Sequence, residues 1–190
     1  MAENTSRDTR SVHAIIVILA LLILGGVSYF IFVSQSVPDT VDDESVVQPY
    51  IVPPLGGEQY VNDTLRFRLE LPEGFSPREM QGTDGVGATI VLEDAEANGI
   101  QIATRPFDED LRVLSVERVQ SDIPDMQIIE PQPVEIGESH TGLAFKSDNE
   151  AFSGASREVW FVFNGTLYQI STYERLDNLL KTMFQTWEFF

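Results

Sequence analysis

The residues of this chain that could do nucleophilic or acid–base chemistry are few. Among its 190 residues are two histidines and no cysteine, which excludes a Cys nucleophile, a thiolate metal site and a disulfide. His140 directly follows Ser139 in a segment with the composition of a turn. A Ser-His-Asp triad on an α/β scaffold presents its serine in a G-x-S-x-G turn, and this sequence has none. We therefore interpret His140 and Ser139 as surface or structural residues, and assign no catalytic residue.

Oxygen-ligand metals are the metal chemistry that remains, because a single histidine outside the apolar segment cannot build a zinc site without cysteines. Carboxylates gather in two runs, Asp108-Glu109-Asp110 and Asp148-Asn149-Glu150. Neither run follows the D-x-[DN]-x-[DN]-G order of a calcium-binding loop. Both are interpreted as solvated loop charge, so the sequence assigns no metal-binding and no cofactor-binding residue.

Three other patterns could mark binding or modification, but each also has a structural interpretation. Gly82, Gly85 and Gly87 lack the lysine and the following helix of a phosphate-binding loop, and so predict a flexible loop. The sequence Asn62-Asp63-Thr64 is a glycosylation sequon, to be used only in a eukaryotic secretory pathway. Trp160 and Trp187 fall on predicted strands and are expected to be core residues rather than ligand platforms.

Acidic side chains dominate the composition. The chain has 30 Asp and Glu against 12 Lys and Arg, a net charge of −18. The four charges near the N-terminus (Glu3, Arg7, Asp8 and Arg10) cancel, so the whole excess follows the apolar segment described next. Such a surface repels phosphate groups, which argues against nucleic acid as a partner, while a basic protein or a cation is compatible with it.

One segment is long and apolar enough to cross a lipid bilayer. It runs from Val12 to Val33, with the sequence VHAIIVILALLILGGVSYFIFV. At ~1.5 Å per residue a helix of this length spans about 33 Å, and the bilayer core is ~30 Å thick. Arg7 and Arg10 precede the segment, and no Lys or Arg follows it until Arg66. The positive-inside rule therefore predicts a single-pass protein of the cell membrane, with residues 1–11 in the cytoplasm and the bulk of the chain outside.

The alternative is a cleaved signal peptide. Its apolar core would be about 7–15 residues long and would end in an A-x-A-like site, of which Ser34-Gln35-Ser36 is a poor version, so a retained anchor is preferred. Residues 34–58 then contain four prolines and the acidic run Asp42-Asp43-Glu44. Proline and charge repulsion favour an extended chain, which predicts a linker, although Tyr50-Ile51-Val52 could instead dock on the domain.

Residues 59–190 are predicted to form one globular α+β domain. Residues 64–71 alternate apolar and polar side chains, as in a strand with one wet face, and residues 88–92 and 100–104 predict a hairpin. A short helix capped by Ser115 follows, then strands near residues 127–136 and 141–147 that meet around Gly137.

The strongest local signal lies towards the C-terminus. Asn164-Gly165 separates two β-rich runs and is the preferred sequence of a type I′ hairpin turn. Residues 159–163 are all apolar, so this strand should be covered on both faces. Residues 176–184 have the spacing of an amphipathic helix, and residues 186–190 predict a closing strand. The pattern favours a mainly antiparallel sheet with two packed helices.

These elements resemble the PsbP-like (Ran-binding-protein-like) α/β/α sandwich domains. Members begin with an alternating strand and a "PEGW"-like turn, here Leu71-Pro72-Glu73-Gly74-Phe75, with Phe where Trp is common. They end with a hairpin, an amphipathic helix and a short aromatic strand, here residues 158–173, 174–184 and 186–189. The resemblance implies a binding or assembly accessory, often tethered outside the membrane, and brings no shared catalytic residues.

Three functions follow from these observations. The leading one is a tethered extracytoplasmic module that binds a protein partner near the membrane, without enzyme activity. The second is a carboxylate-dependent hydrolase, which would need two facing Asp or Glu side chains with raised pKa values in a cleft. The third is a cation-dependent surface protein, which would use the excess of carboxylates.

Overall fold

The computed structural model describes residues 50–81, 86–111, 113–152 and 154–190. The predicted membrane span at residues 12–33 and most of the predicted linker lie outside these ranges. Within them, no helix has both the length and the apolar character that crossing a membrane requires. The elements given below therefore belong to the predicted globular domain and to the last residues of the linker.

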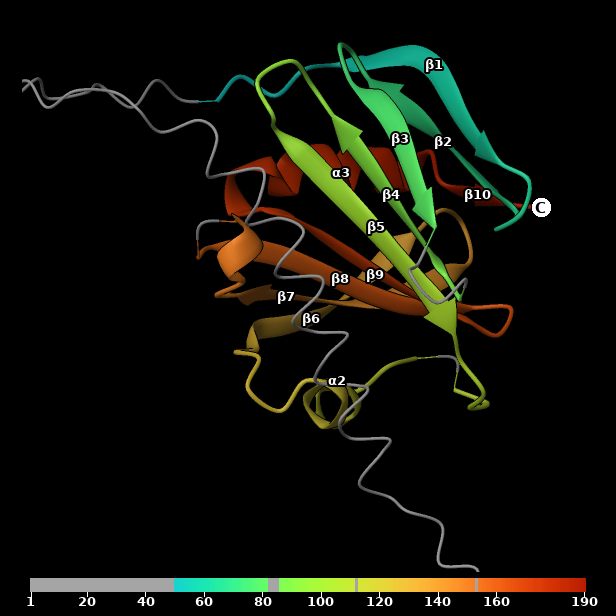
Figure 1. The fold of residues 1–190 in the computed structure, drawn as a ribbon, viewed down its shortest axis with the longest axis vertical. Helices are drawn as coiled ribbons and strands as arrows, with labels where there is room; N and C mark the ends of the chain where they lie inside the picture. Colours follow the sequence, from blue (N-terminus) through green and yellow to red (C-terminus); the bar gives the residue numbers. More distant parts are fainter. Residues whose placement is uncertain (1–49, 82–85, 112, 153) are drawn as a thin grey trace, which may run out of the picture. The chain divides into compact units, whose positions relative to one another are not determined.

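The strands in the described ranges form two sheets (Figure 1). The smaller sheet has the order β1-β2-β10, from β1 (Leu55–Asn62), β2 (Phe67–Pro72) and β10 (Glu188–Phe189). Both pairings are antiparallel, and Phe67 of β2 lies opposite Phe189 of β10. The first and last strands of the domain thus lie in one sheet, on either side of β2.

The larger sheet has seven strands in the order β3-β4-β5-β9-β8-β7-β6, and each neighbouring pair is antiparallel. Its members are β3 (Ser76–Gln81), β4 (Ala88–Glu93), β5 (Gly99–Pro106), β6 (Ile129–Ile136), β7 (His140–Ser147), β8 (Ser156–Phe163) and β9 (Thr166–Tyr173). The central strand pair, β5 and β9, joins the N-terminal hairpin to the C-terminal hairpin. It places Ile102 opposite Ile170, both fully buried.

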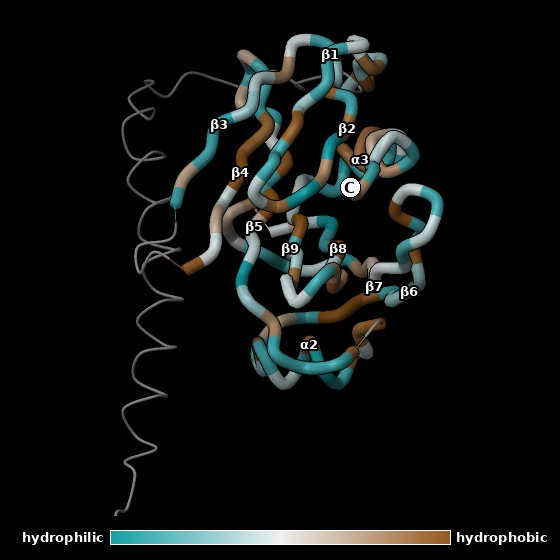
Figure 2. The backbone as a smooth tube through the Cα atoms, turned by 90° about the vertical axis from the view of Figure 1, so that its right-hand side faces the viewer, coloured by the Kyte–Doolittle hydropathy of each residue, from teal (hydrophilic) through white to brown (hydrophobic). Residues whose placement is uncertain are grey.

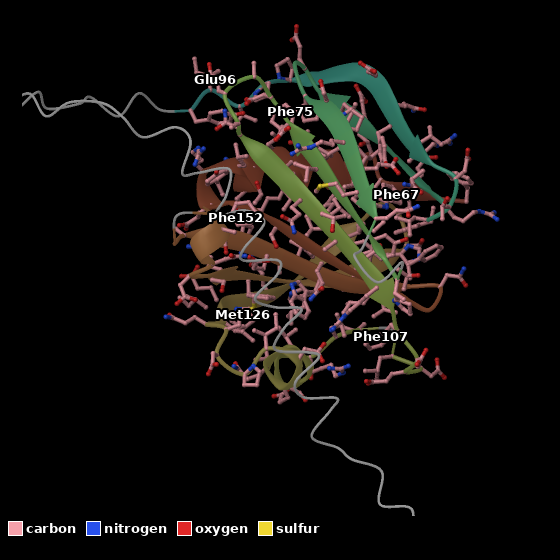
Figure 3. The ribbon with its side chains drawn as sticks, in the orientation of Figure 1. Phe67, Phe75, Glu96, Phe107, Met126 and Phe152 are labelled. Atoms are coloured by element: carbon pink, nitrogen blue, oxygen red, sulfur yellow. The ribbon has the colours of Figure 1, made fainter. Side chains whose placement is uncertain are left out.

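One face of the large sheet packs against the small sheet and helix α3 (Asp177–Gln185), which follows a 3-10 turn at Glu174–Leu176. The apolar face of α3 is buried, as its spacing predicts, through Leu179, Leu180, Met183 and Phe184. Trp187 lies in the same core and stacks on Phe67 with ring centroids 4.5 Å apart. Figure 3 labels Phe67 and Phe75, which come from the small-sheet side of this core.

The opposite face of the large sheet is covered in part by the segment that contains helix α2 (Val116–Asp122), and Figure 1 shows α2 and α3 on opposite sides of this sheet. Ser115 caps α2 by accepting a hydrogen bond from the Arg118 N–H, as predicted. Trp160 lies in a second apolar cluster on this face, with Phe107 and the fully buried Val119. The strand β8 is therefore buried on both faces from Ser156 to Phe161, which confirms the prediction for residues 159–161, whereas Val162 and Phe163 at its end are partly exposed.

The structure confirms a mainly antiparallel α+β domain with two helices, but it differs from the predictions in three respects. There are two sheets, where the sequence suggested one, because the alternation in β2 marks a buried face without identifying the sheet. The strand β3 was not predicted, since all six of its residues are exposed and show no apolar alternation. The strand β1 begins at Leu55, so the folded chain starts before residue 59. Figure 2 shows the hydrophobic residues of β4 beside the more hydrophilic β3.

Candidate binding site at the hairpin end of the domain

The tip of the β8–β9 hairpin organises one end of the domain. Asn164 and Gly165 form the tip with φ values of 46° and 71°, the positive values that a type I′ turn requires at both positions. The Gly165 carbonyl accepts a hydrogen bond of 2.8 Å from the Phe107 N–H. The chain that leaves β5 is thereby held against the hairpin, and the acidic residues 108–110 follow directly.

A hollow of about 470 Å³ opens at this end, and we name it the His140 hollow. Its lining combines carboxylate and apolar side chains from three parts of the chain: Glu109, Asp110, Leu111 and Val113 after β5, His140 from β7, and Val162 and Phe163 from β8. Leu111 is 38% exposed and Val113 is 56% exposed. Both apolar side chains are thus in contact with solvent beside the carboxylates of the hollow.

His140 is placed in this hollow by aromatic packing. Its ring lies edge-on to Phe163 at 4.9 Å and tilted against Phe189 at 4.6 Å, measured between ring centroids. Ser139 Oγ is 3.0 Å from His140 Nδ1, and burial lowers the pKa of His140. Burial of the ring thus favours its neutral form.

The contact between Ser139 and His140 does not have the geometry of a catalytic pair. In a triad, one ring nitrogen faces the nucleophile and the other is held by a carboxylate. Here the hydroxyl of Ser139 occupies Nδ1, and within the described ranges no hydrogen bond joins His140 to a carboxylate.

The two carboxylates of the His140 hollow differ in their partners. Glu109 accepts a hydrogen bond from Arg118 Nε at 3.0 Å, and the two side chains form an ion pair. Asp110 is exposed, and no ion pair joins it to another side chain of the described ranges. Among the described residues, the hollow thus contains one carboxylate that has an ion-pair partner and one that has none.

Most of the basic side chains in the described ranges are paired with carboxylates of the domain itself. The pairs are Arg68–Glu188, Arg78–Glu93, Arg105–Asp122, Arg118 with Glu109 and Asp122, Lys146 with Glu130 and Glu174, Arg157–Asp177 and Lys181–Asp177. Residues 50–190 contain 24 acidic and 10 basic residues. Intramolecular pairing therefore leaves an excess of carboxylates for any binding partner.

A second hollow, of about 570 Å³, has Glu79, Thr104 and Thr166 among its lining residues. Tyr60 Oη donates a hydrogen bond of 2.5 Å to Glu79 Oε1 beside it. Burial and this hydrogen bond raise the pKa of Tyr60. Because Tyr60 belongs to β1 and Glu79 to β3, the bond joins the edges of the two sheets.

The sequon at Asn62 is not available for modification in the folded domain. The Asn62 side chain is 6% exposed, and its Nδ2 donates a hydrogen bond of 2.9 Å to Tyr60 Oη. Its Oδ1 accepts a bond of 2.8 Å from the Leu65 N–H. A glycan on Nδ2 would compete with the hydrogen bond to Tyr60, so the burial of Asn62 disfavours modification once the domain has folded.

The structure separates the other polar residues that the sequence singled out. Asp148 accepts a hydrogen bond from Gln127, whereas Asn149 donates one to Glu158. Among the described residues, no three His, Cys, Asp or Glu side chains are grouped to hold a metal ion.

The glycines near β4 had been predicted to form a flexible loop. Gly87 instead has φ of +82°, and a Cβ on it would lie 2.1 Å from the Thr104 carbonyl oxygen, so the close approach to β5 requires glycine. Gly82 and Gly85 lie outside the described ranges.

Glu158 was not singled out from the sequence, yet it is the buried carboxyl of the described chain, 1% exposed on β8. It accepts hydrogen bonds from Ser156 Oγ at 2.8 Å, Ser171 Oγ at 2.5 Å and Asn149 Nδ2 at 3.2 Å. Burial raises its pKa, and these hydrogen bonds partly oppose the rise. Its flanking apolar run concealed it, because a single Glu in a buried strand has no distinctive spacing.

Comparisons with known proteins bear on the fold. No protein-family model and no curated protein matches the chain. A similar solved structure is the solution structure of cyanobacterial PsbP (CyanoP) from Synechocystis sp. PCC 6803, with 11% sequence identity and a TM-score of 0.44 over 70% of this chain and 92% of that chain.

Proposed function

We propose that this chain is a membrane-tethered accessory protein whose domain binds a protein partner outside the cytoplasm. In this proposal residues 12–33 anchor the chain in the cell membrane, residues 1–11 remain in the cytoplasm, and the Pro-rich acidic stretch from residue 34 is a stalk. The apolar length of the anchor and the arginines that precede it support this topology.

The observation that supports a binding role is the composition of the His140 hollow. It combines solvent-exposed Leu111 and Val113 with a carboxylate, Asp110, that lacks an ion-pair partner in the described chain. Its histidine is held by Phe163 and Phe189 rather than by a carboxylate. Apolar surface with a few convergent polar groups is the usual lining of a binding site.

The surroundings of Glu158 support binding over carboxylate-dependent hydrolysis. A hydrolase of that class pairs an acid of raised pKa with a second carboxylate in a cleft. Glu158 has the raised pKa, but the groups that hydrogen-bond it are two serine hydroxyls and an asparagine amide. These contacts are those of a buried carboxyl satisfied within the sheet.

The proposed topology can be tested with single cysteines, because the chain has none of its own. We expect a membrane-impermeant thiol reagent, added to intact cells, to label Ser121→Cys and to leave Ser6→Cys unlabelled until the membrane is opened. Ser121 is exposed on α2, so access by the reagent is not limited by burial. Labelling of Ser6→Cys in intact cells, or of neither variant, would overturn the orientation.

The binding role is tested by capture. The full chain, extracted from native membranes after photo-crosslinking from position 113, should yield a discrete set of crosslinked proteins. A crosslinker at position 51, where Ile51 is 87% exposed, is the control for non-specific contact. Repeated recovery of no protein from position 113, or of the same set from both positions, would contradict the proposal.

A further inference from the structure

The chemistry of the His140 hollow indicates the kind of group it accepts. Val162, Phe163 and Val113 supply an apolar wall, which suits a chain of methylene groups. Asp110 supplies a carboxylate at the same hollow. Lysine and arginine are the side chains that combine an aliphatic stem with a cationic end, and they bury the stem while the end stays close to water.

The charge of the domain argues for the same group. Arg118 pairs with Glu109 and Asp122, and no basic side chain of the described ranges forms an ion pair with Asp110. Arg112, two positions further along the chain, lies outside those ranges. A second copy of the chain would bring the same excess of carboxylates to the contact, and an anionic lipid or nucleic acid would be repelled as well. A basic segment of a different protein is the occupant that complements this surface.

We infer that the His140 hollow binds a lysine or arginine side chain from an exposed segment of the partner protein, with its stem on Val113, Val162 and Phe163 and its cation at Asp110. The inference rests on the proposed binding function and names the chemistry of the contact. At about 470 Å³, the hollow falls within the range of roughly 300–1,000 Å³ that is typical of ligand sites. It therefore has room for the side chain and its flanking backbone.

The test uses the full chain in neutral nanodiscs, with labelled Val and Leu methyl groups observed by NMR. The probe is the peptide acetyl-Gly-Ala-Lys-Ala-Lys-Gly-amide. A matched peptide replaces both lysines by norleucine, which keeps the stem and removes the charge. We expect the lysine peptide to shift the methyl signals of Val113 and Val162 in a saturable way at low salt, and the norleucine peptide to bind more weakly.

Two pairs of variants separate the hollow from general charge and hydrophobicity. Asp110→Asn should weaken binding of the lysine peptide by about two- to fivefold, the effect of losing an exposed ion pair. Asp125→Asn removes an exposed carboxylate outside the hollow and should leave binding unchanged. Val113→Ser should weaken both peptides, whereas Ile51→Ser should weaken neither.

The inference is overturned if the lysine and norleucine peptides bind equally, if Asp110→Asn and Asp125→Asn have the same effect, or if the methyl groups of the hollow do not shift. Shifts that depend on the concentration of the chain and not on the peptide would assign the surface to a second copy instead. Crosslinking from position 113 distinguishes the proposed binding function from the proposed contact with a basic side chain. A crosslinked partner whose yield is the same with Asp110→Asn leaves the binding function standing and removes the basic contact.

Discussion

The turn between β6 and β7 offers a sharp test of the fold, because it rests against the C-terminal end of α3. Gly137 has φ of +57°, and a Cβ placed on it would lie 2.1 Å from the Trp187 carbonyl oxygen. The Gly137 N–H also donates a hydrogen bond of 2.8 Å to the Phe184 carbonyl. The substitution Gly137→Ala must therefore accept a left-handed backbone and also move the turn away from α3.

The expected loss of unfolding free energy in Gly137→Ala is the sum of a backbone cost and a hydrogen-bond cost. A left-handed conformation costs an L-residue about 1–2 kcal/mol, and loss of the hydrogen bond to Phe184 adds roughly 0.5–1.5 kcal/mol. We expect Gly137→Ala to lower the free energy of unfolding by about 2–3 kcal/mol, with separation of the turn from Trp187 as the structural cause. The matched control is Gly74→Ala, since Gly74 has φ of +81° but a Cβ there would meet nothing within 4 Å.

The assay is denaturant unfolding of the full chain, followed by the fluorescence of Trp160 and Trp187, both 2% exposed. Gly74→Ala should lose only the backbone part, about 1–2 kcal/mol. Because the same turn leads into Ser139 and His140, Gly137→Ala should also weaken binding of the lysine peptide, while Gly74→Ala should not. Equal destabilisation by the two substitutions would refute the reasoning that the contact with Trp187 constrains Gly137.

Two further predictions concern pH. Burial raises the pKa of Glu158. The contribution of this carboxyl to stability is therefore fully present below its unfolded pKa and is lost as the pH rises through its folded pKa. We expect the free energy of unfolding of Glu158→Gln to fall less than that of the unsubstituted chain between pH 5 and pH 8, and parallel pH profiles in denaturant unfolding would contradict this. Burial lowers the pKa of His140, so lysine-peptide binding should weaken as the pH falls from 7 to 5 and an imidazolium forms in the hollow. The variant His140→Gln shows how peptide binding depends on pH when the imidazole is absent and Glu109 and Asp110 remain. An unchanged pH dependence in this variant would exclude His140 as the cause.

The sequence predicted the elements whose signals are local. Asn164-Gly165 specified the hairpin turn, and the spacing of Leu176 to Phe184 specified the buried face of α3, because turn chemistry and helical periodicity act over a few residues. The strand β3 has neither signal, since it is exposed on both faces at a sheet edge. Its pairing with β4 is visible only in the register of the two strands.

The candidate site was less predictable, for a related reason. In the sequence His140 has no partner at a distinctive spacing, and the acidic run at residues 108–110 has the composition of a solvated loop. Their meeting in one hollow depends on the hydrogen bond from Phe107 to Gly165 and on the packing of His140 against Phe163 and Phe189. These contacts join positions that are up to 58 residues apart, and no pattern in a single sequence reports them. The burial of Glu158 was hidden in the same way, by partners on neighbouring strands and loops.

The proposed tether and the proposed basic contact support each other energetically. A single exposed ion pair is worth roughly 0.2–1 kcal/mol, too little to retain a free partner. A flexible linker that holds two surfaces near each other supplies an effective concentration on the order of millimolar, so a weak and salt-sensitive contact suffices for a partner in the same membrane. The excess negative charge then acts mainly in selection, because it disfavours anionic neighbours over distances of about 10 Å, while the His140 hollow distinguishes among the basic ones.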